Sequence, residues 1–343
     1  MLTTPRPGAL ASCRQYLPAV DSAHLDCISD AIALLLAHAG VADVRAPFAA
    51  DWRFDLVDRD AALPRLDLPP ADLDSRLAAR TGYTLDWHPL SSVGEALPHW
   101  RDHLAAGRPV MVVGDAFHLP WVPYAGHEHM DHGFVLDGLH DLGPATTIAQ
   151  LVDPYQNTTE WGPALPHTRM APIADLAAAV IAGRWAVLTR TGSGRPIDFA
   201  AQLADNATAI EGAHHAGEPS RFVHAHRALD EPALANLTMQ TWLLARSRAL
   251  HGRWLGDAAS AQANLDPGYL NAGDLDLGDL ADRFDRMVTQ AWRRAAQAAY
   301  LALRRLRSGR EVPPACLSAA AQATTAEAEL AGRLRSRLAD REP

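Results

Sequence analysis

Lysine is absent from this sequence, so all 31 basic residues are arginines. Chemistry that needs a lysine amine, such as Schiff-base formation, is therefore excluded. Acidic residues outnumber the arginines and give a formal net charge of −9. A chain with this charge balance is not built to coat nucleic acid, so we expect no nucleic-acid partner.

Cysteine is scarce and long apolar runs are missing. The three cysteines, Cys13, Cys27 and Cys316, are too few for a disulfide framework and too far apart for a CxxC metal knuckle. No segment approaches 18 consecutive apolar residues, and the start lacks the basic and apolar regions of a secretory signal. We therefore expect a cytoplasmic protein with no membrane partner.

The length of 343 residues fits two domains, and the run TGSGRP at 191–196 is typical of a linker. Before it, a helix-rich segment is followed by several strands, which indicates an α+β fold. After it, long Ala/Leu/Arg segments have helical spacing. We predict a catalytic domain over 1–192 and an all-helical domain over 193–343. The expected helices are 26–39, 71–80, 93–106, 173–182, 197–213, 231–251, 274–307 and 315–339, and the expected strands are 109–114, 132–138, 146–153 and 185–190.

Cys27 falls in the first turn of a predicted helix that Asp26 can cap and Gly40 can end. Unpaired N–H groups and the helix dipole at that position favour a thiolate. The start of a helix is thus a suitable position for the nucleophilic cysteine of an enzyme. The alternative is a buried structural cysteine, which is a common fate of a free thiol.

His132 opens one predicted strand and Asp153 closes the next. If 139–146 forms the reversal, the strands pair antiparallel and His132 faces Asp153, with Cβ atoms about 5 Å apart. The carboxylate can then orient the imidazole, as in a catalytic triad. A polar pair at the rim of a hairpin is the alternative, but the chain order Cys, His, Asp matches papain-like enzymes and favours the triad.

Four runs carry a resemblance to a known family: HLDCISDAIALLLAHAG, GRPVMVVGDAFHLPW, DHGFVLDGL and LVDPY. Over about 24–190 the chain resembles the butirosin biosynthesis protein H family and, more distantly, the bacteriocin-processing cysteine peptidases attached to ABC transporters. The resemblance implies a papain-like core followed by a helical domain. The family's namesake moves an acyl group from an acyl carrier protein onto an aminoglycoside amine. Carried over to this chain, the family's nucleophile falls on Cys27, its histidine on His132 and its acid on Asp153.

The sequence departs from the papain pattern just before the cysteine. Papain-like enzymes usually place a Gln there to bind the oxyanion, whereas this chain has Asp21, Ser22, Ala23 and His24. The backbone N–H of Cys27 can still donate, and Ser22 or His24 is the candidate second donor. This departure weakens a peptidase hypothesis more than a transferase hypothesis, because a thioester opens more easily than an amide.

The segment GHEHMDH at 126–132 holds three histidines, which with Glu128 or Asp115 form a candidate zinc site. The spacing has no helical i, i+4 pattern and no second ligand cluster is evident, so we predict no metal and a loop that covers the site. Asp115 itself follows an apolar strand, where it suits either a substrate amine or a turn cap.

An arginine-rich segment lies within the predicted helix 274–307. Arg293 and Arg294 are the candidate docking residues for an acidic acyl or peptidyl carrier protein. The alternative is a solvated helix face with Asp partners. Cys13 and Cys316 lack a nearby base or acid motif and are predicted to be packing residues.

Together these features predict an acyltransferase of natural-product biosynthesis. It would move an acyl group from a phosphopantetheine-linked thioester, through Cys27, to a small amine or hydroxyl acceptor without a further cofactor. A cysteine hydrolase acting on peptides or amides is the first alternative, with water as the acceptor. A non-catalytic binding module is the second, and the presence of Cys27 argues against it.

Overall fold

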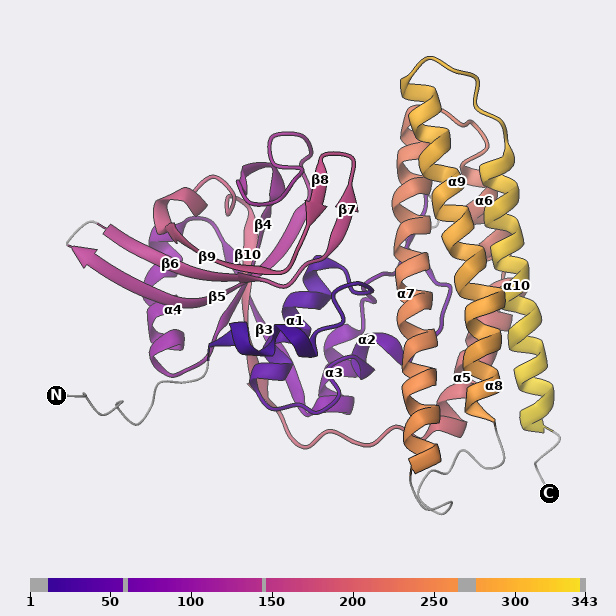
Figure 1. Cartoon of the computed structure of the whole chain (residues 1–343), viewed down its shortest axis with the longest axis horizontal. Helices are drawn as coiled ribbons and strands as arrows, with labels where there is room; N and C mark the ends of the chain where they lie inside the picture. The colour runs from indigo at the N-terminus through magenta and orange to yellow at the C-terminus, as the bar shows by residue number, and fades with distance from the viewer. Residues whose placement is uncertain (1–11, 58–60, 144–145, 265–275, 340–343) are drawn as a thin grey trace. The chain divides into compact units, whose positions relative to one another are not determined.

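A computed structural model of the chain describes residues 12–57, 61–143, 146–264 and 276–339. The chain divides into two compact units (Figure 1). The first contains the described residues up to Arg45 and those of Asp74–Arg195, and the second contains those of Ala46–Leu73 and those from Pro196 onward. Helices and strands are mixed, so the α+β class predicted from the sequence is confirmed.

The first unit is built on a six-stranded sheet with the order β3-β10-β4-β5-β6-β9, in which every neighbouring pair is antiparallel. All four residues from Val110 to Val113 on β4 are buried. Since successive side chains point to opposite faces, both faces of the sheet are covered at its centre. The strands are β3 Tyr83–Leu90, β4 Val110–Asp115, β5 Asp131–Gly143, β6 Thr146–Asp153, β9 His167–Pro172 and β10 Gly183–Arg190, with a separate hairpin of β7 Asn157–Thr159 and β8 Gly162–Ala164.

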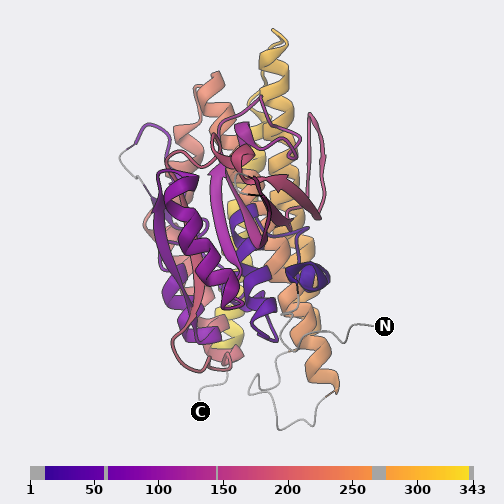
Figure 2. The same ribbon diagram turned by 90° about the vertical axis from the view of Figure 1, so that its left-hand side faces the viewer.

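Helices cover this sheet. Helix α1 (Cys27–His38) packs against β5 and β4, and α4 (Val93–Ala105) packs against β3, β4 and β5. Figure 2 shows α4 in front of the strands. The predicted helices over 26–39 and 93–106 are thus confirmed. The shorter helical elements of this part of the chain are η1 Cys13–Ala19, α3 Leu73–Thr81, η2 Ala116–His118 and η3 Ile173–Leu176.

Several elements of the first unit differ from the prediction, among them β7, β8 and β9, which have no predicted counterpart. The helix expected over 173–182 is wrong: it is only the four-residue 3-10 turn η3, because the chain turns at Ala182, with φ of 60°, to enter β10 at Gly183. Strand β3 has no counterpart among the predicted strands, since Pro89 and a mixture of polar and apolar residues hide its pattern. Such a sequence is tolerated because β3 lies at the edge of the sheet.

The second unit contains a helical bundle in which α7 (Glu231–Asn264) packs against α9 (Gln290–Arg307), α9 against α10 (Ala315–Ala339), and α10 against α5 (Phe199–His215). Figure 1 shows α7, α9 and α10 running alongside one another. None of the helices in the described part of the chain has a stretch that could span a lipid bilayer. The remaining helical elements are α6 Glu218–Ala225, α8 Leu277–Phe284 and the π-helical turn η4 Asp285–Thr289.

The predicted helices of this unit are confirmed; α10 has the predicted bounds, and the bounds of the others change. Helix α7 continues 13 residues beyond the predicted end at 251, up to Asn264. The helix predicted over 274–307 is continuous through α8, η4 and α9 from Leu277 onward, and its residues 274 and 275 lie outside the described residues.

The segment Ala46–Leu73 belongs to the second unit, although it falls within the domain predicted over 1–192. It contains α2 Ala46–Ala49 and the two-residue strands β1 Leu56–Val57 and β2 Arg65–Leu66. Buried polar side chains of the helices hold its backbone: Asn206 bonds Ala50 and Trp52, and Arg248 bonds the carbonyl of Arg53. These hydrogen bonds join residues more than 150 positions apart, so no local sequence pattern predicts them.

Candidate active site

Cys27 is the first residue of α1. The Asp26 carboxylate caps this helix by accepting hydrogen bonds from the backbone N–H groups of Ile28 and Ser29, at 2.9 and 3.0 Å. The thiol of Cys27 is half-buried, and its Sγ lies 3.7 Å from the carbonyl oxygen of Asp131. The predicted cap and the predicted position of the cysteine at a helix start are therefore confirmed.

Gly133 on β5 lets the start of α1 approach the sheet. A Cβ atom at this position would lie 2.8 Å from the carbonyl oxygen of Cys27 and 3.1 Å from Cα of Ile28. Both neighbours are backbone atoms, which cannot rotate away. The glycine next to His132 is therefore what allows Cys27 and His132 to lie side by side.

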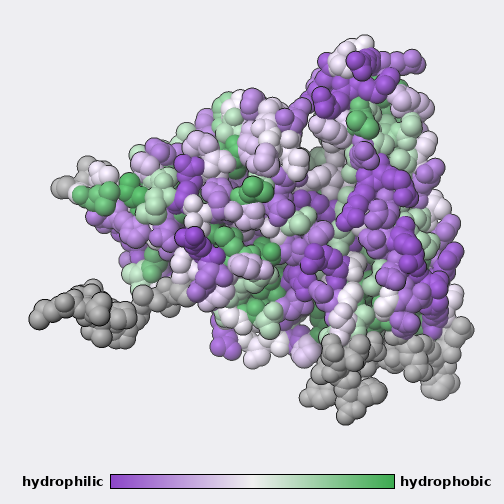
Figure 3. Space-filling view, viewed as in Figure 1, coloured by the Kyte–Doolittle hydropathy of each residue, from purple (hydrophilic) through white to green (hydrophobic). Residues whose placement is uncertain are grey.

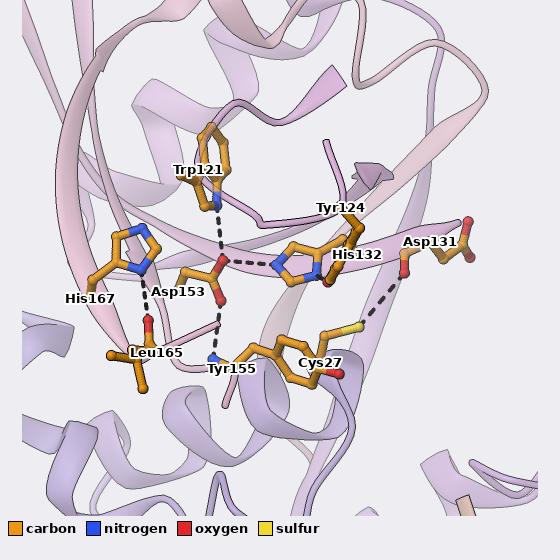
Figure 4. A network of polar contacts seen from close by, with 9 residues as sticks. All are labelled: Cys27, Trp121, Tyr124, Asp131, His132, Asp153, Tyr155, Leu165 and His167. Atoms are coloured by element: carbon orange, nitrogen blue, oxygen red, sulfur yellow. Dashed lines mark hydrogen bonds and ion pairs between the residues drawn. The ribbon is translucent and has the colours of Figure 1, made fainter. Parts of the chain in front are cut away.

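His132 and Asp153 form a buried pair. Nε2 of His132 lies 2.8 Å from Oδ2 of Asp153, and the two side chains are 0% and 5% exposed. In Figure 4, Cys27 lies on the opposite side of the imidazole from Asp153. A thiol, an imidazole and a carboxylate thus follow one another, which is the order that nucleophilic catalysis requires.

The predicted antiparallel pairing of β5 with β6 is confirmed, but the predicted register is wrong. Val152 faces Val135, whereas the predicted register would place it opposite Gly133. Strand β5 continues to Gly143, although the prediction expects the reversal to begin at 139. It carries irregularities between Leu136 and Gly138 and between Asp141 and Gly143, which shift the register. A shift of two residues keeps each side chain on the same face, so His132 and Asp153 still meet, along a diagonal.

Further groups hold Asp153. Its Oδ2 accepts a hydrogen bond from Nε1 of Trp121 at 2.9 Å, and its Oδ1 accepts one from the backbone N–H of Tyr155 at 3.1 Å. Burial alone would raise the pKa of Asp153, but His132 and the N–H of Tyr155 keep it below its usual range. The carboxylate therefore stays charged inside the protein.

The same neighbours determine the charge of His132. Complete burial lowers its pKa, but the charge of Asp153 and its hydrogen bond prevail, with a smaller contribution from Cys27, and the pKa of His132 rises to about 10. The imidazole is therefore protonated at neutral pH in this arrangement. Cys27 therefore has a positively charged ring beside it.

Tyr124 contacts the other nitrogen of the imidazole. Its hydroxyl lies 2.9 Å from Nδ1 of His132, and its side chain is buried (Figure 4). Burial, and then the nearby Cys27, raise the pKa of Tyr124, so its hydroxyl stays protonated. Tyr124 thus lies where His132 and Cys27 meet, and it belongs to the candidate site.

The two candidate oxyanion donors have other partners. The hydroxyl of Ser22, a buried residue, lies 3.5 Å from Oε1 of Gln156. Nδ1 of His24 lies 2.8 Å from a carboxylate oxygen of Asp21. The structure therefore assigns neither residue to the oxyanion, and both roles stay predictions.

Asp115 adopts one of the two roles that the sequence left open. Its Oδ1 accepts a hydrogen bond from the N–H of Phe117, so it caps η2. Its Oδ2 lies 2.6 Å from Nδ1 of His129 and 4.0 Å from Nε2 of His118. His118 and His129 stand eleven residues apart in the sequence, and the loop between them brings them together.

The three histidines of the segment GHEHMDH take different partners. His127 stacks on Trp161, with ring centroids 5.0 Å apart, while His129 contacts Asp115 and His132 contacts Asp153. The structure therefore does not bring these three histidines together, although it does place His129 against Asp115. Their loop does reach the site, since it also carries Trp121 and Tyr124.

The remaining candidates lie elsewhere in the chain. Arg293 and Arg294 are exposed on α9. Cys13 and Cys316 are buried, at 0% and 2% exposure, which agrees with their prediction as packing residues. Burial is also the main cause that raises the pKa of each of these two thiols.

Four residues of the site are absent from the sequence-based prediction: Trp121, Tyr124, Gly133 and Tyr155. Trp121, Gly133 and Tyr155 do stand in the runs GRPVMVVGDAFHLPW, DHGFVLDGL and LVDPY, which carry the family resemblance. Tyr124 has no such signal, because it lies in a loop whose path is not encoded in a periodic pattern.

No curated protein matches the chain significantly. The family model described as butirosin biosynthesis protein H, N-terminal, matches residues 26–151. The matched span includes Cys27 and His132 and ends two residues before Asp153. Over residues 26–151, the chain is therefore similar to the butirosin biosynthesis protein H, N-terminal family, which supports the resemblance that its sequence motifs carry.

Proposed function

We propose that this protein is a papain-like cysteine acyltransferase of antibiotic biosynthesis. It moves an acyl group from a carrier-protein or coenzyme thioester, through Cys27, to an amine or hydroxyl acceptor. One observation carries the proposal: the thiol at the start of α1 lies beside a buried imidazole that Asp153 holds at 2.8 Å.

The first half-reaction loads the enzyme. The Cys27 thiolate attacks the thioester carbonyl, and the carbon–sulfur bond of the donor breaks. The donor thiol leaves with the proton that His132 held. The backbone N–H of Cys27, at the positive end of α1, is suited to stabilise the negative oxygen in between.

The second half-reaction unloads it. The acceptor amine or hydroxyl attacks the acyl-Cys27 carbonyl and gives its proton to His132, and Cys27 leaves as a thiolate. Asp153 balances the charge of the imidazolium whenever His132 is protonated. The donor brings its own phosphopantetheine arm, and these steps use no further cofactor.

Arg293 and Arg294 are proposed to dock an acidic carrier protein. Both are exposed on α9, and the surface of the helical unit seen in Figure 3 is largely hydrophilic. Two adjacent cations attract a negatively charged partner over a distance set by the ionic strength. The overall charge of −9 repels such a partner elsewhere, so a local pair of cations favours docking at this place.

Intact-protein mass spectrometry tests the acyl transfer. The chain is incubated with acyl-pantetheine or acyl-carrier-protein thioesters, and the mass gain is mapped to a peptide. We expect one acyl group on Cys27 that persists until an amine or alcohol is added. Cys27→Ala should abolish the adduct, and Cys13→Ala should leave it unchanged.

A hydrolase would behave differently in the same experiment. If water discharges the adduct as fast as any acceptor, and peptides are cleaved at a comparable rate, the transferase proposal is wrong. If no thioester acylates Cys27, both the transferase and its loading step are wrong.

The docking proposal has a separate test. Replacing Arg293 and Arg294 together with Ala should raise KM for a carrier-bound donor about tenfold and leave KM for acyl-pantetheine nearly unchanged. The matched control replaces Arg304 and Arg305, an exposed arginine pair on the same helix. Equal effects of the two double variants would contradict a docking site at Arg293 and Arg294.

A further inference from the structure

We infer that Asp115, His118 and His129 form a binding site for a divalent transition-metal ion of the zinc type. One ligand atom of each residue lies within 4.8 Å of the other two. The chemistry of this set, two imidazoles and one carboxylate, suits zinc with a water at the fourth position. The sequence offers Asp115 and His129 among candidate zinc ligands but predicts no metal, and only the tertiary structure adds His118 to them.

The distances are close to those of a bound state. In a tetrahedral zinc site with bonds of about 2.0–2.1 Å, ligand atoms lie about 3.3 Å apart. Oδ2 of Asp115 is 2.6 Å from Nδ1 of His129 and 4.0 Å from Nε2 of His118. Small side-chain rotations therefore bring all three atoms to the metal, which takes the place of the proton between Asp115 and His129.

The ligands are also held in place by their neighbours. Oδ1 of Asp115 accepts the N–H of Phe117 at 3.0 Å, which turns Oδ2 towards the two histidines. The ring of His129 stacks on Phe117, with centroids 4.1 Å apart and an angle of 11°. Such outer contacts orient the first ligands of known metal sites and raise their affinity.

The backbone brings the two ends of the ligand set together. Asp115 pairs with Asp131 in the ladder between β4 and β5, and the N–H of Ala116 bonds the carbonyl of Met130 at 2.8 Å. His118 and His129 therefore lie near the two ends of one closed loop. A metal ion at this place joins the ends of the loop.

That loop carries Trp121 and Tyr124, which contact Asp153 and His132. A metal at its base would restrict its opening and keep both side chains in place. This consequence for catalysis rests on the proposed function. The binding of the metal does not, and it can be measured without turnover.

Zinc binding tests the site. The full chain without a histidine tag carries Cys27→Ser, so that the thiolate cannot bind zinc itself, and ZnCl2 is titrated in competition with a chromophoric chelator. We expect one zinc ion per chain. His118→Ala and His129→Ala should each lower the affinity at least about tenfold. Asp115→Asn should also lower the affinity for zinc at least about tenfold. Its amide oxygen should still accept the hydrogen bond from the N–H of Phe117.

His127→Ala is the matched control. His127 lies in the same loop but stacks on Trp161 and is not a member of the cluster. Its replacement should leave zinc binding unchanged. Added zinc should also slow amide hydrogen exchange between Ala116 and Met130 in the chain with the cluster intact, a measurement that needs no substitution in the loop.

Each other outcome overturns the site. These outcomes are the absence of saturable binding, binding that survives His129→Ala and His118→Ala, and an equal loss in His127→Ala. If zinc binds but amide hydrogen exchange in the loop does not change, the inference that the metal joins the ends of the loop is wrong.

Discussion

The hydroxyl of Tyr124 lies 2.9 Å from Nδ1 of His132, opposite the nitrogen that contacts Asp153. His132 is therefore held from both ends, and the tyrosine shares with Cys27 the space on its Nδ1 side (Figure 4). Because Nδ1 carries a proton in the imidazolium, the Tyr124 oxygen accepts from it and the hydroxyl proton remains available to a neighbouring group.

Tyr124→Phe should slow the acylation of Cys27 about 10- to 100-fold. A hydrogen bond to a charged group contributes about 1.5–3 kcal/mol, and about 1.4 kcal/mol corresponds to a factor of ten. Single-turnover kinetics with a thioester donor measure the rate, and a shifted pH profile identifies an effect on His132. Tyr83→Phe, the same change on the edge strand β3, should have no effect. Faster acylation in Tyr124→Phe would show instead that the hydroxyl competes with Cys27.

Gly133→Ala should separate Cys27 from His132. The added Cβ would lie 2.8 Å from the Cys27 carbonyl oxygen, so α1 and β5 must move apart. We expect a loss of about 1–3 kcal/mol in the free energy of unfolding and a fall of about 100-fold in turnover, because a displacement of about 1 Å disturbs the reacting geometry. Chemical denaturation and steady-state kinetics measure the two effects.

The control for this variant is Gly138→Ala on the same strand. There the nearest atoms to the added Cβ are 3.5 Å away or more, which is ordinary contact. Equal losses in the two variants would mean that the close approach of Cys27 to β5 is not what the glycine provides.

Iodoacetamide should label Cys27 at least about tenfold faster than the other two cysteines. Cys13 and Cys316 are buried and burial raises the pKa of each, whereas the thiol of Cys27 is half-buried. Peptide mapping over time measures the three rates. His132→Ala should slow only the labelling of Cys27, and similar rates at all three thiols would contradict the assignment of the nucleophile.

Asp153→Asn should lower the pKa of His132. Burial favours the neutral imidazole, and the Asp153 charge is the principal cause that raises the pKa to about 10. NMR titration of the imidazole nitrogens should find His132 protonated at pH 8 in the parent protein and neutral in the variant. An imidazolium in the variant at pH 8 would mean that another group stabilises the charge.

The same pair makes stability depend on pH. The His132 contribution is complete below its ordinary pKa of 6.5 and is lost as the pH rises through about 10. The Asp153 contribution is complete above its ordinary pKa of 3.8 and is lost as the pH falls through its lowered value. The unfolding free energy of the parent should therefore decline between pH 6.5 and about 10, and chemical denaturation of Asp153→Asn should lack this decline. A parallel decline in both proteins would assign it to another group.

The sequence by itself determined the local features of this protein. The Asp26 cap and Gly40 place α1 and its first residue Cys27, and β6 has the predicted bounds, Thr146–Asp153. These features follow from helix caps and hydrophobic periodicity, which are patterns that span about a dozen consecutive residues. The motifs around Cys27 and His132 also point to the family on their own.

Only the tertiary structure decided how these parts meet. The register of β5 against β6, the approach of Cys27 that Gly133 permits, and the position of Tyr124 on His132 depend on packing between distant segments. The same holds for the segment Ala46–Leu73, whose backbone is bonded by buried side chains of the helical unit. A short stretch of sequence encodes its own conformation, whereas its partner is selected by the burial and hydrogen bonding of the whole unit.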